Sequence, residues 1–311
     1  MQIYYELSKV KKDKNTVLTL GTFDGVHLGH KKIIKEVIKK AVFYKSRNFL
    51  ITFYPHPRSV ISKDFDNYVL STVDEKFSLL KELGIENILV IKFTKEFSQI
   101  SPEDFVKKYL VNKIGTKEII IGHDHHFGKG RGGDESTLRE LGKELDFQVT
   151  AVQAVDISGK TVSSTKIRNV LSEGNVQQAN IFLGRYYSFS GKVVVGDKRG
   201  RELGFPTANI ELEDETKILP AIGIYFVQIE VNNNKHFGLL SIGKRPTFHN
   251  SGEIIPEVYI YDFDENIYGK NIKIELIEKL REEIKFNTAD ELVVQMNIDK
   301  QSGLKLIKNF K

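Results

Sequence analysis

The stretch that decides the fold is GTFDGVHLGH, residues 21–30. The apolar residues 17–20 that lead into it predict a short buried strand. Beyond it, apolar residues recur three and four positions apart between lysines, at Ile33, Ile34, Val37, Ile38, Ala41 and Val42. Because this spacing is the periodicity of an amphipathic helix, the stretch lies where a strand turns into a helix.

The residues of this junction suit a bound triphosphate. Glycine lets the backbone turn tightly and approach a ligand closely. His27 and His30 are three positions apart, so they share one face of the expected helix. The start of a helix also offers free N–H groups and the positive end of the helix dipole. Two other interpretations compete, since a single histidine is usually structural and HxxH is half of a metal site in some proteins.

Length and composition restrict the class of protein. A chain of 311 residues predicts two domains. The net charge of +5 comes from 46 basic and 41 acidic residues that are interspersed, which indicates a solvated surface and no nucleic-acid stripe. There is no cysteine, which excludes a disulfide framework, a thiolate nucleophile and a cysteine-based zinc site and fits a reducing cytoplasm. The polar first 15 residues predict no signal peptide, and no window is apolar enough to span a membrane.

Strands and helices alternate in the first half of the chain. Further strands are expected at residues 49–53, 87–91, 118–121 and 147–152. Helices are expected at 74–84, from Ser101 onward and near 135–145. This order predicts an α/β fold in which helices cover both faces of a parallel sheet, with ligands at the carboxyl ends of the strands.

Two loops lie at that edge of the sheet. In YPHPR, residues 54–58, two prolines stiffen the chain, and a rigid connector explains it as well as a binding site does. The loop GHDHHFGKGRGGD, residues 122–134, formally contains GxGxxG, but no strand runs straight into the first of these glycines. The histidines at 123, 125 and 126 could bind a metal together with Asp124. This is a minority interpretation, because adjacent side chains point apart.

A second phosphate site is expected at SSTKIR, residues 163–168. Ser163 or Ser164 can cap the helix that begins there, whose first N–H groups then face outward. Together with Lys166 and Arg168, the hydroxyl groups form a cradle for phosphate, and arginine can bind it through two hydrogen bonds. The alternative is a capped surface helix with ordinary charges.

The pattern changes after a short helix at 175–184, and we place the domain boundary between residues 185 and 186. Short apolar runs follow at 193–195, 224–229, 237–240, 258–261 and 272–276, separated by turn residues. They predict a compact antiparallel β-barrel. From Thr288 the tail returns to helix, and Glu291 three residues later is a capping-box signal. The loop GDKRGRELGFPTAN, residues 196–209, is rich in glycine and basic residues that suit phosphate.

In chain order, these motifs resemble those of the prokaryotic bifunctional riboflavin kinase/FAD synthetase family. GTFDGVHLGH resembles its HxGH signature, TFYPHPR its TFxPHP segment, residues 122–134 its GxDFxFGxxRxGD flap, and SSTKIR its SSTxIR segment. The resemblance implies a Rossmann-like FAD synthetase domain over residues 1–185, in which His27, His30 and Arg168 are catalytic. It also implies nucleotide and substrate contacts at Gly21, Thr22, Phe23, Asp24, Gly29, His56, Pro57, Gly122, Asp124, Phe127, Arg131, Ser163, Ser164 and Thr165. His125 stands where the family usually has phenylalanine.

The second half carries the matching kinase motifs. Residues 196–209 resemble the riboflavin kinase loop that ends in PTAN, GKRPT resembles IGxRPT, and REEIKF resembles RxExxF. The resemblance implies a β-barrel riboflavin kinase domain with a C-terminal helix over residues 186–311, with Glu257 as the catalytic base and Mg²⁺ held by Thr207 and Asn209. It implies binding residues Gly196, Lys198, Gly200, Gly204, Pro206, Thr207, Asn209 and Arg281. Tyr259 stands where the family often has histidine.

The implied reactions use ATP twice. Riboflavin is phosphorylated to FMN, and FMN is then adenylylated to FAD with release of pyrophosphate. We accordingly expect ATP and Mg²⁺ as cofactors, riboflavin, FMN and ATP as partners, no nucleic acid or membrane, and a cytoplasmic monomer or weak oligomer. Two alternatives remain, namely a transferase with another acceptor such as phosphopantetheine, and a nucleotide- or RNA-binding regulator without activity.

Overall fold

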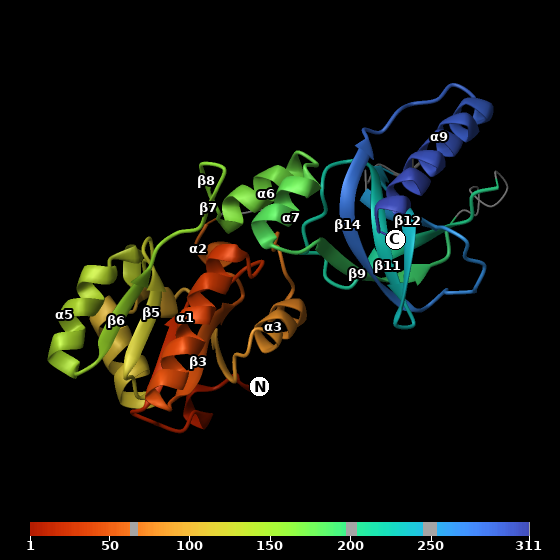
Figure 1. Cartoon of the computed structure of the whole chain (residues 1–311). Coiled ribbons are helices and arrows are strands. Elements are labelled where there is room, and N and C mark those ends of the chain that lie inside the picture. The colour runs from red at the N-terminus through yellow and green to blue at the C-terminus, as the bar shows by residue number, and fades with distance from the viewer. Residues whose placement is uncertain (63–67, 197–203, 245–253, 311) are drawn as a thin grey trace. The chain divides into compact units, whose positions relative to one another are not determined.

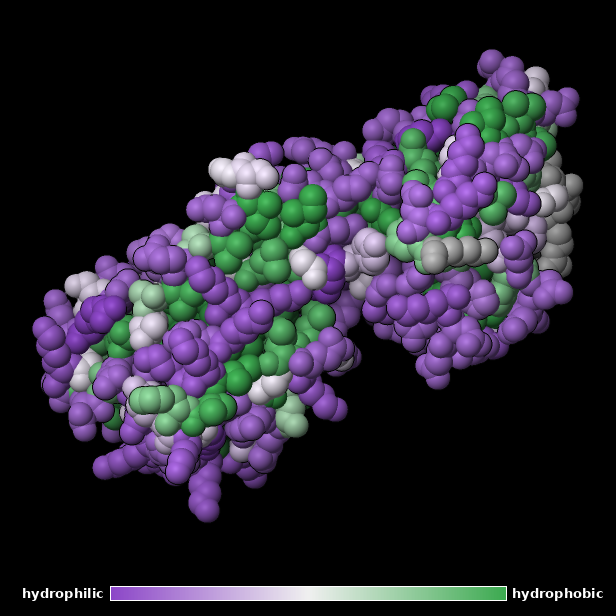
Figure 2. Space-filling model, in the orientation of Figure 1, coloured by the Kyte–Doolittle hydropathy of each residue, from purple (hydrophilic) through white to green (hydrophobic). Residues whose placement is uncertain are grey.

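The computed structural model describes residues 1–62, 68–196, 204–244 and 254–310 (Figure 1). Its contacts divide the chain into two compact units, Met1–Ser164 and Thr165–Lys311. The predicted site residues Lys198 and Gly200 lie outside the described residues, as does most of the GKRPT turn. No helix among the described residues is long and apolar enough to cross a membrane. The face drawn in Figure 2 is mainly hydrophilic, with smaller hydrophobic areas between.

The described part of the first unit contains the predicted parallel sheet, with six strands in the order β1-β4-β3-β2-β5-β6. The strands are β1 (Gln2–Tyr4), β2 (Thr16–Leu20), β3 (Arg47–Tyr54), β4 (Asn87–Lys92), β5 (Glu118–Gly122) and β6 (Gln148–Val152). Every neighbouring pair is parallel. Their carboxyl ends therefore meet at one edge of the sheet, where the predicted loops follow.

Helices cover both faces of this sheet, as predicted. On one face lie α1 (Leu28–Tyr44) and α3 (Val73–Glu82), and on the other η3 (Phe105–Ile114) and α5 (Glu135–Leu145). Successive strand residues point to opposite faces, so Val17 joins the first core and Leu18 the second. The central strands contribute mostly apolar side chains to both cores, together with buried threonines such as Thr19 and Thr52, which explains their nearly continuous hydrophobic runs.

Short elements connect this framework. Ser101 begins α4 (Pro102–Asp104) as predicted, since its Oγ accepts a hydrogen bond from Asp104 N at 3.1 Å, and the chain continues as the π-helical η3. The other short elements of the unit are η1 (Leu7–Lys9), α2 (Pro57–Ile61), η2 (Phe97–Gln99), η4 (Lys129–Arg131), β7 (Asp156–Ile157) and β8 (Lys160–Thr161).

The second unit contains the predicted antiparallel barrel, closed in the order β10-β13-β12-β11-β14-β9. The strands are β9 (Tyr187–Val194), β10 (Thr207–Leu212), β11 (Gly223–Val231), β12 (Asn234–Lys244), β13 (Ile254–Ile260) and β14 (Asn271–Arg281). The C-terminal helix α9 (Ala289–Ile307) precedes η5 (Lys308–Phe310) and begins at Thr288, whose Oγ1 accepts from Glu291 N at 3.2 Å. Leu304 of α9 packs against a core cluster that includes Phe226 of the barrel.

Two helices precede the barrel, α6 (Ser164–Ser172) and α7 (Val176–Leu183). Asn180 of α7 donates from Nδ2 to Leu276 O at 2.9 Å, and its Oδ1 accepts from Tyr187 N at 2.6 Å. Ala221 N donates to Leu171 O at 3.0 Å. The contacts therefore group these helices with the barrel, whereas the sequence pattern predicted a boundary between residues 185 and 186.

Candidate functional site

The loop between β2 and α1, residues 21–27, has a backbone that few sequences tolerate. Gly25 has φ 79°, and Phe23 and Val26 also have positive φ, at 49° and 39°. A Cβ on Gly25 would lie 2.9 Å from Leu70 Cδ1, closer than real Cβ contacts come. Both its conformation and its surroundings therefore require glycine at position 25, as the tight turn predicted.

The two histidines of HxGH meet at the start of α1. His27 is the N-cap, and its Nδ1 accepts a hydrogen bond from His30 N at 3.4 Å. The two rings stack with centroids 3.7 Å apart and an angle of 19° between their planes. A Cβ on Gly29 would lie 3.1 Å from His27 Cε1, so the small residue leaves room for this ring. His27 is buried and His30 is half-buried, so both imidazoles line the helix start without full exposure.

Asp24 holds the loop against residues 70 and 71, for which the sequence pattern predicted no role. The buried carboxylate accepts from Leu70 N at 2.9 Å and from Ser71 N at 3.1 Å. Ser71 Oγ in turn accepts from Gly25 N at 3.0 Å. Asp24 thus holds the shape of the loop, while a contact between Asp24 and substrate stays a prediction.

Lys76 of α3 lies beneath the same loop. Its Nζ donates to Thr22 O at 3.3 Å and to Thr52 Oγ1 at 3.2 Å, and the residue is only 8% exposed. Burial lowers the pKa of Lys76 to about 8, and the negative charge of Asp24 opposes that shift. The sequence does carry a signal, because Lys76 interrupts the apolar stripe that includes Phe77 and Leu80 of this helix.

The SSTKIR segment reaches this loop through its second serine. Ser164 Oγ donates to Asp24 O at 2.9 Å, across 140 residues of sequence. Ser163 beside it is half-buried, and both serines belong to the first unit. Thr165 and Arg168 belong to the second unit, so their proximity to the histidines stays a prediction.

The loop after β3 places its histidine at a helix start. His56 is the N-cap of α2, and its Nδ1 accepts from Arg58 N at 3.2 Å. Pro57 occupies the first turn, where its missing N–H costs nothing. The imidazole of His56 is therefore oriented by the backbone, and a contact between His56 and substrate stays a prediction.

The loop after β5 is closed at its base. Phe127 and Gly133 exchange backbone hydrogen bonds of 2.9 and 3.0 Å, and the Phe127 ring packs into the sheet's core. Gly122 at the strand end is half-buried, whereas Asp124 and Arg131 are exposed. Phe127 therefore anchors the loop in the core, and the contacts of Phe127, Asp124 and Arg131 with the nucleotide stay predictions.

His125 sits beside Phe127 with its ring nearly parallel, 6.0 Å between centroids. Burial lowers the pKa of His125 to about 4, so its imidazole is neutral at pH 7. Among residues 1–62, 68–196, 204–244 and 254–310, no group of three or more histidine, cysteine, aspartate or glutamate side chains could hold a metal ion. The minority interpretation of residues 123–126 as a metal site thus finds no support in the described chain.

In the second unit, three predicted residues meet on neighbouring strands. Asn209 of β10 pairs with Glu257 of β13 in the barrel register, and Thr207 pairs with Tyr259. Thr207 Oγ1 donates to Glu257 Oε2 at 3.4 Å. With the amide oriented to satisfy both neighbours, Asn209 Nδ2 donates to Glu257 Oε1 at 2.9 Å and Oδ1 accepts from Gly196 N at 3.3 Å. A Cβ on Gly196 would overlap the Asn209 amide, so this close approach requires glycine.

Residues 204–206 of the PTAN loop are exposed apart from one aromatic ring. Gly204, with φ 82°, and Pro206 are exposed, whereas Phe205 is buried with its ring centroid 5.6 Å from that of Tyr259. Tyr259 also contacts the Tyr261 ring at 5.5 Å. The tyrosine that replaces the family's usual histidine is therefore part of an aromatic cluster that packs this loop against the barrel.

Arg281 is bound to an acidic residue of α9. Its Nε and Nη2 donate to Asp299 at 2.9 and 2.7 Å, and its Nη1 donates to Glu282 O at 2.9 Å. Asp299 is 5% exposed and also accepts from Gln295 Nε2 at 2.9 Å. This two-bond ion pair fastens α9 to the end of β14. The predicted contact of Arg281 with substrate stays a prediction.

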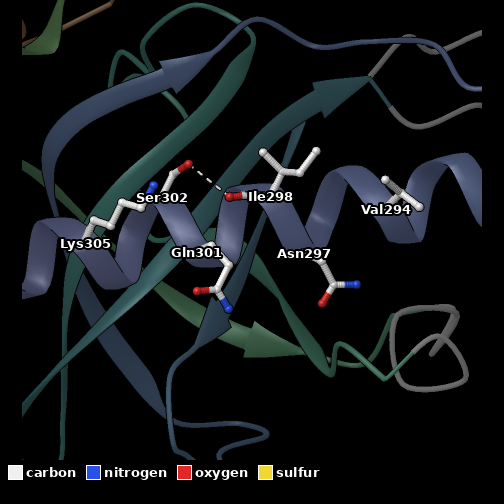
Figure 3. Close-up of a pocket in the computed structure, with 6 residues that line it drawn as sticks. All are labelled: Val294, Asn297, Ile298, Gln301, Ser302 and Lys305. Atoms are coloured by element: carbon white, nitrogen blue, oxygen red, sulfur yellow. Dashed lines mark hydrogen bonds between the residues drawn. The ribbon is translucent and has the colours of Figure 1, made fainter.

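A surface hollow runs along α9 on the second unit (Figure 3). Its lining residues are Val294, Asn297, Ile298, Gln301, Ser302 and Lys305. All of them come from one helix, and none is among the residues that the motifs predicted. The hollow is thus distinct from the Thr207–Asn209–Glu257 cluster.

Comparisons with known proteins agree on both halves of the chain. A family model described as FAD synthetase matches residues 9–166, and one described as riboflavin kinase matches residues 183–307. A bifunctional riboflavin kinase/FMN adenylyltransferase of Listeria monocytogenes is 39% identical, over 93% of this chain and 91% of that protein. The protein of the same name from Bacillus subtilis is 36% identical, over 97% and 95%.

A solved structure matches the whole architecture. It is described as a macrolide-efflux protein from Streptococcus pneumoniae and superposes with a TM-score of 0.89. The two are 29% identical in sequence, and the match covers 96% of this chain and 97% of that one. The extent of these matches, together with the HxGH loop and the Thr207–Asn209–Glu257 cluster, leads to one assignment: this chain belongs to the family of bifunctional riboflavin kinase/FMN adenylyltransferases.

Proposed function

We propose that this chain phosphorylates riboflavin with ATP to give FMN, and then joins FMN to the adenylyl group of a second ATP to give FAD. The observation that carries the proposal is that each half of the chain has a set of phosphate-compatible residues and matches its own family model, FAD synthetase for residues 9–166 and riboflavin kinase for residues 183–307. The HxGH loop serves adenylyl transfer, and the cluster around Glu257 serves phosphoryl transfer.

In adenylyl transfer, a phosphate oxygen of FMN attacks the α-phosphorus of ATP. The new P–O bond forms as the bond from the α-phosphorus to the bridging oxygen breaks, and pyrophosphate leaves. Because FMN itself is the nucleophile, the protein's task is to position the reactants and neutralise charge. The helix start of α1 with His27 and His30 is suited to the negative charge that builds on pyrophosphate. We assign Ser164 and Arg168 to the same phosphates.

In phosphoryl transfer, the 5′-hydroxyl of riboflavin attacks the γ-phosphorus of ATP and ADP leaves. Glu257 is the proposed base, because its carboxylate is half-buried and already accepts hydrogen bonds from Thr207 and Asn209. These neighbours hold the carboxylate in one orientation, so it is ready to accept the hydroxyl proton.

The same cluster fits a magnesium ion. Thr207 Oγ1 lies beside the Glu257 carboxylate, and Asn209 adds an amide oxygen on the side of Gly196; hard cations prefer such oxygen ligands. We assign Thr207 and Asn209 to Mg²⁺, which when bound offsets negative charge on the nucleotide phosphates. The glycine-rich residues 196–204 are proposed to hold those phosphates.

The organisation of the chain is part of the proposal. We keep the functional division at residues 185 and 186, since the riboflavin kinase match begins at 183. The absence of cysteine supports a cytoplasmic location, and we expect a monomer or weak oligomer.

The direct test is to incubate the protein with riboflavin, ATP and Mg²⁺ and to separate the flavins by chromatography. We expect FMN to appear first and FAD afterwards, with ADP and pyrophosphate as the other products. Adenylylation of phosphopantetheine without any flavin product would favour a transferase with another acceptor. Salt-sensitive RNA binding without turnover would favour a regulator.

A further inference from the structure

A charged side chain that neither proposed reaction uses lies buried beneath residues 21–27, the loop to which we assign ATP and which is called the ATP loop below. Lys76, on α3, places its ammonium between the carbonyl oxygen of Thr22, 3.3 Å away, and the hydroxyl of Thr52, 3.2 Å away. Thr22 belongs to the GTFDGVHLGH loop, and Thr52 is a fully buried residue of β3. The ammonium therefore connects the loop, the sheet and α3 at one point.

The segment that carries Lys76 binds the loop at further points. Asp24 accepts backbone hydrogen bonds from Leu70 and Ser71, and Gly25 N donates to Ser71 Oγ. The start of α3 is itself fixed by a capping box between Thr72 and Glu75, with bonds of 3.3 and 3.0 Å. The loop is thus held by a rigid segment that lies 46 residues further along the chain.

The hydrogen bonds of Lys76 are not needed to satisfy its neighbours. Thr22 O also accepts from Thr52 Oγ1 at 3.1 Å, so this carbonyl keeps a partner without the lysine. An apolar side chain of similar length would fill the same volume without the cost of burying a charge. What the lysine adds is positive charge and a fixed Thr22 backbone, directly below the loop that the proposed reaction loads with a triphosphate.

We infer that Lys76 is a positioning residue for adenylyl transfer, which fixes the Thr22 backbone of the ATP loop and supplies positive potential to the triphosphate from beneath. The inference rests on the proposed function of the first unit. Lys76 acts through the loop and takes no part in bond making.

Titration of Lys76 makes FAD formation depend on pH. Burial lowers the pKa of Lys76 to about 8, against the opposing effect of Asp24. Asp24 is the ionisable group that faces the ammonium from the loop, whereas Thr22 and Thr52 present neutral oxygens. Because the protonated lysine is the active form, FAD formation falls as pH rises through about 8.

The test compares four full-length proteins: the natural chain, Lys76→Met, Lys76→Arg and Lys81→Met. Lys81 lies on the exposed side of the same helix, so Lys81→Met is the matched control. Rates of FAD formation from FMN and ATP are measured over roughly two pH units on either side of pH 8. Riboflavin phosphorylation by the same samples is the internal readout for folded protein.

We expect Lys76→Met to lower kcat/KM for ATP in FAD formation by about tenfold or more and to lose the fall near pH 8. Lys76→Arg, which stays charged, should recover part of that loss and keep its rate at alkaline pH. Lys81→Met should behave as the natural chain does, and phosphorylation of riboflavin should be equal in all four proteins.

Two results would overturn the inference. One is that Lys76→Met keeps the natural kcat/KM together with the fall near pH 8. The other is that it loses both activities equally, which would show a general structural role. Failure of the proposed function is distinguishable, because the natural chain itself would then form no FAD.

Discussion

At the residue scale, the proposed phosphorylation of riboflavin depends most on the carboxylate of Glu257. It receives hydrogen bonds from Thr207 on one oxygen and Asn209 on the other, so glutamine in its place can keep part of this network. Glu257→Gln removes only the proton acceptor. We expect riboflavin phosphorylation to fall by about 10²–10⁴-fold, the usual contribution of a general base.

The measurement for Glu257→Gln is the rate of FMN formation from riboflavin, with FAD formation from added FMN as the control. The second rate should be unchanged, because Glu257 lies in the barrel and the HxGH loop in the other unit. Near-normal phosphorylation by a folded Glu257→Gln protein would remove this residue from the mechanism.

We also predict that Lys76 makes the free energy of unfolding depend on pH. This dependence has the opposite sign to that of FAD formation. Burial lowers its pKa from 10.5 to about 8, so between those pH values the unfolded chain holds a proton that the folded chain has released. The free energy of unfolding therefore rises with pH in this window, by up to about 3 kcal/mol. Lys76→Met should lack this rise and should be at least as stable as the natural chain at pH 7.

Urea unfolding near pH 7 and near pH 10, followed by circular dichroism, measures this difference. Lys81→Met controls for the loss of one lysine from α3. An equal rise of stability with pH in Lys76→Met and the natural chain would assign the rise to other groups. A strong loss of stability in Lys76→Met at pH 7 would show that the lysine serves the fold.

At the scale of elements, α7 determines how short a fragment of the second unit can be and still fold stably. Its residues Val176, Ala179, Phe182 and Leu183 are buried, and Asn180 joins it to β14 and β9. A fragment of residues 165–311 keeps these contacts, whereas a fragment of 186–311 loses them. Because several apolar side chains leave the interior, we expect the shorter fragment to be less stable by at least about 3 kcal/mol.

Denaturant unfolding of the two fragments gives that difference. Both retain Thr207, Asn209 and Glu257, so each should phosphorylate riboflavin under conditions in which it is folded. Equal unfolding midpoints would mean that α7 contributes little to the barrel, and would favour a structural boundary at 185 and 186.

Most elements could be predicted from sequence because their patterns are local. The strands β2 to β6 are apolar runs bounded by turns, and α1 shows its periodicity directly. Four strands were not predicted, for physical reasons: β7 and β8 have two residues each, too few to show any period. β1 has only three residues, Gln2–Tyr4, too few for a period, and β10 overlaps the PTAN motif, which its polar residues make look like a loop.

The site residues that belong to sequence motifs could be predicted, whereas those outside the motifs could not. The proximity of His27 and His30 follows from their spacing, whereas a common site for Asn209 and Glu257 was implied only by the resemblance to the family. The supports of the site were missed, because Ser71 and Lys76 reach the loop only through tertiary hydrogen bonds. The Asp299 carboxylate that binds Arg281 likewise comes from a helix whose sequence shows no sign of that partner.

At the scale of the whole molecule, the chain joins two folds whose proposed ATP-using sites are built from different residues. The proposed phosphate site of the first unit is a helix start with two imidazoles, and the proposed kinase site of the second is a barrel edge where a carboxylate, the proposed base, lies beside neutral oxygens. The product of the barrel is the substrate of the sheet domain. Each set of residues lies within its own part of the chain, so the two activities should be separable by single substitutions.

The most direct measurement uses His30→Ala and Glu257→Gln, each given riboflavin and ATP, alone and mixed. We predict that His30→Ala stops at FMN, since loss of one preorganised charge-stabilising group costs about 3 kcal/mol in the transition state. Glu257→Gln should form no FMN, and the mixture should again make FAD. His236→Ala, in the barrel, should behave as the natural chain does. A folded His30→Ala that makes no FMN, a folded Glu257→Gln that makes no FAD from added FMN, or a mixture that makes no FAD from riboflavin would contradict two independent sites.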